Sequence, residues 1–295
     1  MTAFTNVLVS GLLLGGIYGL VSVGLNLIFG VVRIVNFAQG EFIMIAMYAT
    51  YACFVVFGLS PYVTVFLVAP AMFGLGLVVQ RVLLQPLRDE PLMQVFATFG
   101  LLILMQNLVL AATRGEGMSV AVAASRTIID LGGVKVNAAR LIVFVVTAAI
   151  TVGLALFLRA TLAGKAVRAV IQDRDAARMM GINVERTYLL VFATGAALAG
   201  VAGSLLAPIY TLSPYIGGNF ILAAFAVVVL GGMGSVTGAY IGGLGVGIVE
   251  SFAGYYIDPG LKQAIWFAIF IAVLIVRPSG LLGQAGAEEV GLDTH

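Results

Sequence analysis

Residues that commonly serve catalytic and metal sites are nearly absent from the chain. Cys53 is the only cysteine, and His295, the last of 295 residues, is the only histidine. A single cysteine excludes an intrachain disulfide and a cysteine-ligated metal cluster. The His-Glu-x-x-His motif of zinc hydrolases is missing as well, so metal-dependent hydrolysis is not expected. The sequence therefore predicts no metal site and no catalytic residue.

Charged residues are also scarce. They make up 9% of the chain, against 61% hydrophobic residues, and the net charge is only +2. So small a net charge gives no indication of nucleic-acid binding. A mean hydropathy of +1.12 lies far above that of soluble proteins. The composition indicates an integral membrane protein.

Long apolar runs without charges follow one another along the sequence. A helix needs about 20 predominantly apolar residues to cross a hydrocarbon core of roughly 30 Å. The first run, 7–30, follows no Lys or Arg and is too long for a signal peptide, so we expect it to be retained. The pattern predicts an all-α, polytopic membrane helix bundle of about eight or nine transmembrane segments. It forms a single domain, 1–295, with a polar C-terminal tail at 284–295. The predicted segments are 6–29, 40–59, 62–81, 92–112, 140–158, 187–209, 219–232, 237–256 and 262–277, of which 219–232 is short enough to be broken or re-entrant.

Basic residues are concentrated in one loop, 159–186, which holds six of the fifteen. The positive-inside rule places this loop in the cytoplasm. Counting crossings from it places the N-terminus and the loop at 114–136 outside, and the C-terminus inside if nine segments cross. The six residues are Arg159, Lys165, Arg168, Arg174, Arg178 and Arg186.

The same loop contains a polar, helix-prone segment. No Pro or Gly occurs between Lys165 and Met180, which predicts one helix of about four turns. Gly181 suits the left-handed position that ends a helix, and Ile182 the apolar contact after it. The helix either anchors the loop on anionic headgroups or docks into a soluble partner and transmits its movement to the bundle. A helical projection places one small-residue face at Ala169, Asp173, Ala176, Ala177 and Met180.

Small residues recur at four-residue spacing in three predicted segments. Such rows let helix backbones approach closely inside a membrane, although a row can also line a path. The segment 231–247 has no Gly-x-Gly-x-x-Gly motif, so a dinucleotide site is not expected; its glycines permit close packing or a hinge. The rows are Gly11, Gly15 and Gly19; Gly195, Ala199 and Gly203; and Gly234, Gly238 and Gly242.

The stretch DAARMMGINVERTYLLV, 175–191, resembles the cytoplasmic coupling signature of ABC importer permeases. That signature has an acidic residue, two alanines, three variable residues, a glycine and a later aliphatic residue. Three further stretches resemble the branched-chain amino acid permeases of the LivH type: GLNLIFGVVRIVNFAQGEFIM (24–44), FAVVVLGGMGSVTGAYIGGLGVGIVES (225–251) and VRPSGLLG (276–283). The predicted coupling residues are Asp175, which departs from the usual Glu, Ala176, Ala177, Met180 and Gly181.

The resemblance implies the membrane subunit of an ATP-driven importer that moves branched-chain or related small amino acids across the bacterial inner membrane into the cytoplasm. Its implied partners are a second, related permease subunit, two cytoplasmic ATPase subunits and a periplasmic substrate-binding protein. The only Gly-Lys pair, Gly164-Lys165, is followed by alanine, so the phosphate-cradling Gly-x-x-x-x-Gly-Lys-Ser/Thr loop is absent. We expect no cofactor in this chain and ATP use by the partners. Permeases for urea, amides or aromatic acids remain the alternative.

Ionisable and amide side chains inside membrane segments are expensive and indicate function. Those after the first run either form a cytoplasmic turn or meet a polar solute within the bundle. Of the adjacent Gln106 and Asn107, at least one should face protein. An ion-coupled secondary transporter, the other transport class, would need an acid at the bilayer midplane, and Glu250 lies too near a segment end. The candidates for a translocation path are Asn36, Gln39, Glu41, Asn107 and Glu250, the last lining an outer vestibule or lying in the membrane interface.

Overall fold

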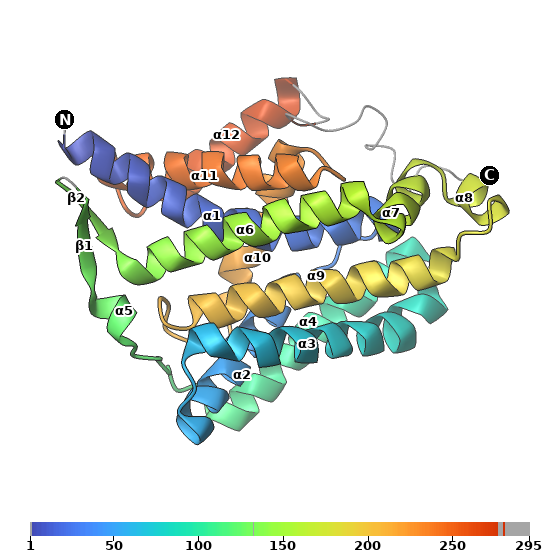
Figure 1. Cartoon of the computed structure of the whole chain (residues 1–295), viewed down its shortest axis with the longest axis horizontal. Helices are drawn as coiled ribbons and strands as arrows, with labels where there is room; N and C mark the ends of the chain where they lie inside the picture. The colour runs from blue at the N-terminus through green and yellow to red at the C-terminus, as the bar shows by residue number, and fades with distance from the viewer. Residues whose placement is uncertain (1, 132, 277–279, 281–295) are drawn as a thin grey trace.

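The computed structural model describes residues 2–131, 133–276 and 280 as a helix bundle in which several long helices run roughly along the long axis of the molecule and others are inclined to it (Figure 1). Within these residues, seven helices are long and apolar enough to cross a membrane, and two shorter apolar helices accompany them. The predicted all-α membrane helix bundle is thereby confirmed, whereas eight or nine membrane crossings stay a prediction, since seven helices are long enough to cross and two are shorter. The predicted tail, 284–295, lies outside the described residues. The long helices are α1 (Thr2–Val32), α2 (Gln39–Phe57), α3 (Pro61–Val79), α4 (Pro91–Thr113), α6 (Ala138–Ala160), α9 (Val184–Leu206) and α11 (Val236–Tyr256), and the shorter ones α10 (Ile216–Gly231) and α12 (Lys262–Val276).

Short elements connect these helices at the two ends of the bundle. A π-helical turn and a 3₁₀ turn continue α3, and an antiparallel hairpin precedes α6. Two helices too short and polar to span a membrane join α6 to α9. The elements are η1 (Gln80–Leu84), η2 (Gln85–Leu87), α5 (Ala123–Arg126), β1 (Ile128–Leu131), β2 (Val134–Asn137), α7 (Leu162–Gln172) and α8 (Arg174–Met179).

The N-terminus and the α7–α8 loop lie at opposite ends of the bundle (Figure 1). The Arg88 side chain pairs with Glu185, which places the turn before α4 at the α7–α8 end. At the other end, the Lys135 backbone N–H of β2 donates a hydrogen bond to Asn6 Oδ1 of α1 at 2.9 Å. The turn before α4 and the α7–α8 loop therefore lie at one end of the bundle, and the N-terminus and the hairpin before α6 lie at the other. This is the separation that the distribution of basic residues predicts. Which end faces the cytoplasm stays a prediction at this point.

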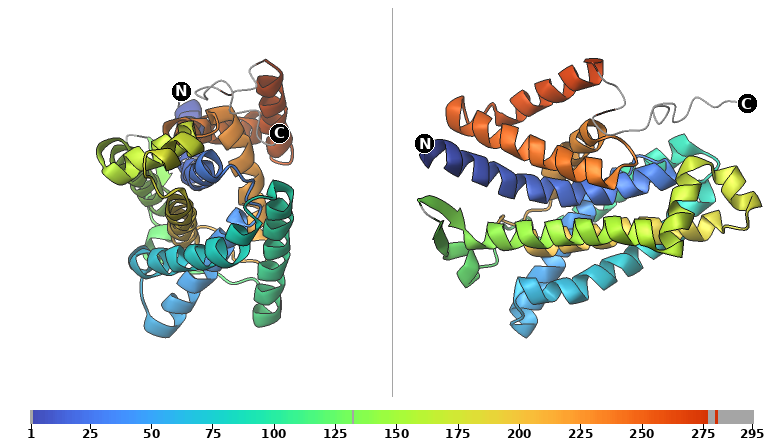
Figure 2. Two further views of the ribbon diagram at one scale, coloured as in Figure 1. Left: turned by 90° about the vertical axis from the view of Figure 1, so that its right-hand side faces the viewer. Right: turned by 45° about the horizontal axis from the view of Figure 1, so that its top comes forward.

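Helix α1 is the central element of the bundle, in contact with α6, α9, α10 and α11 (Figure 2). Its closest neighbour is α11. A Cβ atom at Gly247 would lie 2.3 Å from the backbone nitrogen of Gly15, and one at Gly243 would lie 2.4 Å from that of Gly19. The two backbones touch directly, so the predicted packing role of the glycine row in α1 is confirmed.

The other two predicted rows also pack, but against different partners. Gly203 of α9 faces the Ile43 carbonyl oxygen of α2, at 2.5 Å from an added Cβ. Gly238 and Gly242 face Gly231 of α10, whereas the glycines of α11 that meet α1 lie one position further round the helix. The short helix α10 is thus held against α11 by the row that the sequence indicates.

The glycine-rich turn between α10 and α11 is tethered to α1. Asn26 is fully buried. Its Nδ2 donates hydrogen bonds to the Gly232 oxygen at 3.2 Å and the Ser235 oxygen at 2.8 Å, and its Oδ1 accepts one from the Gly234 N–H at 2.6 Å. Bending at this turn, the predicted hinge, would have to break these bonds.

Candidate functional site

The polar segment of the 159–186 loop forms two helices, not the single helix predicted from Lys165 to Met180. Helix α7 ends at Gln172, and Asp173 is extended, with φ −155° and ψ 111°. Its carboxylate accepts hydrogen bonds from the backbone N–H groups of Asp175 and Ala176, both at 2.9 Å. Asp side chains compete in this way with a continuous helix and favour a new N-cap. The chain therefore turns sharply at Asp173.

The cap also affects the ionisation of Asp173. Its bonds from the N–H groups of Ala176 and Asp175, helped by the charge of Arg33, hold the pKa of this carboxyl below its ordinary value. A lowered pKa means that the cap stabilises the folded loop above the ordinary pKa of an aspartate and is lost as the pH falls through the lowered one. The cap is therefore intact at neutral pH.

The predicted end of the helix at Gly181 is confirmed. Gly181 has a φ of +84°. Its N–H donates to the Arg178 oxygen, and the Ile182 N–H donates to the Ala177 oxygen, both at 3.0 Å. This pair of bonds is the Schellman arrangement that terminates helices at a left-handed residue.

The predicted small-residue face does not exist as one surface, because the break at Asp173 turns α8 away from α7. Ala177 is 4% exposed and belongs to the core of the chain itself, whereas Met179 and Met180 are each 83% exposed. Asp175 and Gly181 are exposed and Ala176 is half-buried. Of the predicted coupling residues, Met180 is thus free to meet a partner, and Ala177 holds α8 against the bundle.

Arg33 joins the α7–α8 loop to the end of α1. It is a non-glycine residue with a left-handed φ of +57°. Its Nη2 donates a hydrogen bond to the Ile171 oxygen, near the end of α7, at 3.4 Å. Arg33 begins the six-residue connection that leads back into the bundle to α2. The loop and this connection therefore share a direct contact.

Three of the predicted path residues lie inside the bundle, where that connection ends. Asn36, Gln39 and Glu41 are all fully buried. Asn36 Nδ2 donates to Gln39 Oε1 at 3.3 Å, and Gln39 Nε2 donates to the Gly195 oxygen of α9 at 3.1 Å. This burial favours the second of the two alternatives, an interior turn formed by residues 33–41, and its contact with a solute stays a prediction.

Glu41 has one satisfied and one unsatisfied oxygen. Oε1 accepts a hydrogen bond from Gln106 Nε2 of α4 at 2.9 Å, and an added Cβ at Gly217 of α10 would lie 2.8 Å from it. Oε2 is buried and has no hydrogen-bond partner among the described residues. Since buried polar atoms are normally paired, this oxygen requires an explanation.

Helix α4 presents polar residues to the protein and apolar residues outward. Its buried residues are Gln94, Thr98 and Met105. Thr98 Oγ1 accepts a hydrogen bond from the Phe37 N–H at 3.4 Å, and Gln94 Nε2 donates to the Leu84 oxygen at 3.0 Å. The helix is therefore held to the interior turn mainly by polar contacts.

Gln106 is the side chain of its pair that faces protein, as predicted for at least one of the two. Asn107 is exposed, and its Nδ2 donates to the Ile103 oxygen of its own helix at 2.8 Å. The sequence did contain a signal for the correct residue. Gln94, Thr98 and Gln106 are separated by multiples of four, which places them on one side of a helix.

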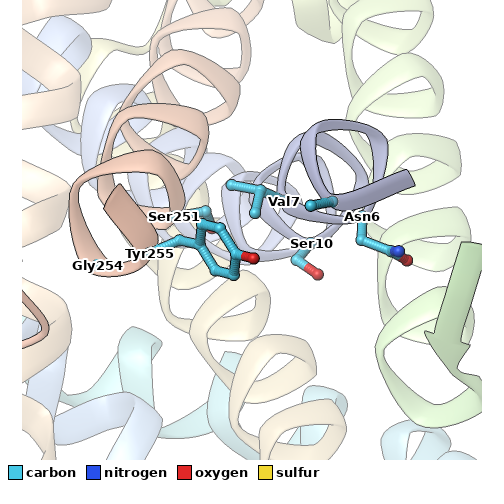
Figure 3. Close-up of a pocket in the computed structure, with 7 residues that line it drawn as sticks. Asn6, Val7, Ser10, Ser251, Gly254 and Tyr255 are labelled. Atoms are coloured by element: carbon cyan, nitrogen blue, oxygen red, sulfur yellow. The ribbon is translucent and has the colours of Figure 1, made fainter. Parts of the chain in front are cut away.

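Glu250 is buried in an ion pair. Its Oε1 lies 3.0 Å from Lys262 Nζ of α12, and its Oε2 accepts a hydrogen bond from the Tyr18 hydroxyl of α1 at 2.8 Å. A pocket of about 600 Å³ opens between α1 and α11 at the N-terminal end of the bundle, and Glu250 does not line it. Figure 3 shows Asn6, Ser10 and Tyr255 around this pocket. Glu250 ties three helices together.

These features define a multi-pass helical membrane protein with a polar interior turn and a capped helical loop at one end. The chain belongs to the family described as the branched-chain amino acid transport system / permease component, which it matches over residues 7–274.

Curated relatives match nearly full length. The chain is 32% identical to the high-affinity branched-chain amino acid transport system permease protein LivH of Salmonella typhimurium, over 97% of this chain and 98% of the relative. It is 32% identical to the permease protein BraD of Pseudomonas aeruginosa, over 96% of this chain and 97% of the relative. It is 30% identical to the probable LivH of Methanocaldococcus jannaschii, over 90% and 88%. No solved structure matches the chain. The relatives are transport permeases and not enzymes, and the resemblance found in the motifs is confirmed.

Proposed function

We propose that the chain is a transmembrane subunit of an ATP-driven importer that carries branched-chain or related small amino acids across the bacterial inner membrane into the cytoplasm. The similarity to branched-chain amino acid permeases over nearly the full length carries this proposal. A second related permease subunit completes the membrane path. Two cytoplasmic ATPase subunits hydrolyse ATP, and a periplasmic binding protein delivers the substrate.

Reconstitution tests this function. The chain is placed in proteoliposomes with the proposed partner permease and ATPase subunits, with the binding protein outside and ATP inside. We expect radiolabelled leucine to accumulate only when ATP and the binding protein are both present. Accumulation driven by an ion gradient without the ATPases would contradict the proposal and support a secondary transporter.

In the proposed orientation, the α7–α8 end faces the cytoplasm and the N-terminus faces the periplasm. The basic residues of the loop support this assignment. Helix α8 then meets an ATPase subunit through Met179 and Met180, beside the exposed Arg178. The buried Ala177 holds α8 against the bundle, and the Schellman bonds at Gly181 fix the path of the chain from α8 towards α9. A displacement of the two methionines therefore displaces the helices of the bundle as well.

Arg33 transmits this displacement to the interior turn. It contacts the end of α7 through Ile171, and it begins the connection that carries Asn36 and Gln39. Phe37 and Glu41 of the interior turn hydrogen-bond to Thr98 and Gln106 of α4, respectively. A shift of the loop on ATP binding would therefore reach α4 through the Arg33 hydrogen bond, the backbone of the connection and the hydrogen bonds to Thr98 and Gln106.

Replacing Arg33 with Gly should reduce the amount of leucine imported per ATP hydrolysed, because Gly keeps the left-handed backbone and removes the guanidinium. Because a hydrogen bond from a charged group is lost, we expect the leucine imported per ATP to fall roughly tenfold. Arg33→Lys keeps a donor and should recover part of the coupling. The readout is the ratio of uptake to ATPase activity in proteoliposomes. A normal ratio in Arg33→Gly would show that the contact transmits nothing.

The substrate path runs beside the interior turn, between α2, α4 and α10. The unpaired Oε2 of Glu41 supports this placement, because a buried carboxyl oxygen without a partner is costly to retain. The ammonium group of a passing amino acid supplies the missing partner. The neighbouring Gln106 and Thr98 keep that side of α4 polar.

Glu41→Gln should lower leucine uptake by roughly tenfold, since a charge-assisted hydrogen bond to the substrate is lost. The amide oxygen can still accept from Gln106, so the bundle should remain folded. Asn107→Leu, one residue from Gln106 on the exposed side of α4, is the matched control and should transport normally. Initial uptake rates at equal protein amounts decide the outcome, and equal rates for wild type and Glu41→Gln would remove Glu41 from the path.

A further inference from the structure

A groove of about 520 Å³ lies between α6 and α9, near the α7–α8 end of the bundle. The two helices run side by side (Figure 1) and meet only weakly. Leu154 and Phe157 of α6 and Leu190 of α9 form its walls, and Leu27 of α1 and Val167 of α7 contribute from the buried core. The groove is therefore apolar over most of its surface.

Most polar groups of the groove already make hydrogen bonds within the chain. The Thr187 and Thr194 hydroxyls donate to the Asn183 and Leu190 oxygens of their own helix, at 3.0 and 2.7 Å. The Asn183 side chain accepts from the Arg186 backbone N–H at 2.8 Å. The Arg186 guanidinium is exposed and has no side-chain hydrogen bond or ion pair within the described part of the chain. The groove thus combines an apolar length with a single free positive charge.

The positive charge of Arg186 lies at the end of the groove nearest to the α7–α8 loop, which in the proposed orientation is the cytoplasmic membrane surface. Arg186 is in the first turn of α9, and Thr194 lies eight residues further along, about 12 Å of helix. A second, smaller cavity of about 140 Å³ shares Leu27, Leu158 and Val167 with the groove, and it is lined by Arg159 and Arg168. Basic pockets between membrane helices on the cytoplasmic side bind anionic headgroups.

We infer that this groove is a binding site for an anionic phospholipid of the cytoplasmic leaflet. One acyl chain lies between α6 and α9, and the phosphate lies at Arg186, while Arg159 and Arg168 add positive charge at the adjoining cavity. The inference uses the proposed orientation of the chain but not the identity of its substrate. A bound lipid would hold α6 and α9, the two helices that carry the α7–α8 loop, at a fixed distance.

Native mass spectrometry of the assembled complex with phosphatidylglycerol, and separately with phosphatidylcholine, tests the site. We expect phosphatidylglycerol to be retained preferentially. Arg186→Gln should reduce its retention roughly tenfold, because a charge-assisted hydrogen bond is lost. Leu190→Trp, which fills the groove, should also reduce it. Arg174→Gln, at the exposed start of α8 and outside the groove, should leave it unchanged.

Equal retention of phosphatidylglycerol by wild type and Arg186→Gln would overturn the inference. So would a photo-crosslinker at Leu190 that reacts with a partner subunit in place of lipid, since the groove would then be a protein interface. Lipid retention is measured without transport, so this inference can fail while leucine uptake succeeds, and the reverse.

Discussion

Gly247→Val is expected to prevent the bundle from packing. A Cβ at this position would lie 2.3 Å from the nitrogen and 2.4 Å from the Cα of Gly15. These are backbone atoms of the central helix, so no side chain can rotate away to relieve the overlap. Overpacking of a core typically costs about 1–3 kcal/mol even where side chains can adjust. Separation of α1 from α11 should cost more, because it also disrupts the Asn26 bonds to the α10–α11 turn.

The matched control for this variant lies two residues away. Gly245 is on the same helix, and an added Cβ there meets nothing within 4 Å. Size-exclusion chromatography of fluorescent fusions in detergent should show a folded yield roughly tenfold lower for Gly247→Val and near wild type for Gly245→Val. Similar profiles for the two variants would mean that the close contact between α1 and α11 is wrong.

The double variant Met179→Asp, Met180→Asp should insert and fold normally but lose uptake. Both side chains are 83% exposed in the chain, so their replacement leaves the bundle intact. An apolar anchor buried at an interface contributes about 2 kcal/mol, or roughly 30-fold in affinity. Two aspartates would remove both anchors and add charge.

Co-purification of the ATPase subunits with the permease, together with uptake, measures the effect. The conservative pair Met179→Leu, Met180→Leu keeps the apolar surface and should retain both properties. Full assembly and normal uptake with both aspartates would exclude α8 as the docking element. Ala177→Arg would be an unsuitable test, because the buried Ala177 faces the bundle and the variant would disturb folding.

The membrane helices could be predicted because hydrophobic length alone determines where a helix can span. Even the shortness of α10, Ile216–Gly231, follows from the glycine-rich stretch that ends it. The helix end at Gly181 was equally local, since only glycine adopts a φ of +84° without strain. Features decided within one turn of chain were therefore accessible from the sequence.

Features that depend on competing local interactions, or on residues far away in the sequence, could not be predicted from the sequence. Helix propensity favoured one helix through Asp173, and the side chain's two backbone hydrogen bonds outweighed it. The partner of Glu250 is Lys262, on the next helix, and no pattern within α11 indicates that pair. Likewise, Glu41 and Gln106 meet only because α4 packs on the interior turn.

Contact between α8 and the ATPase subunits at the cytoplasmic face is the central requirement of the proposed transport mechanism. A photo-crosslinking amino acid at Met180 of the assembled transporter, in native membranes, tests this contact directly. The predicted result is an adduct with an ATPase subunit whose yield changes when ATP binds, and none from the same probe at Phe66, which is exposed on the flank of α3. Adducts from Met180 with lipid alone, or with the periplasmic binding protein, would contradict the account.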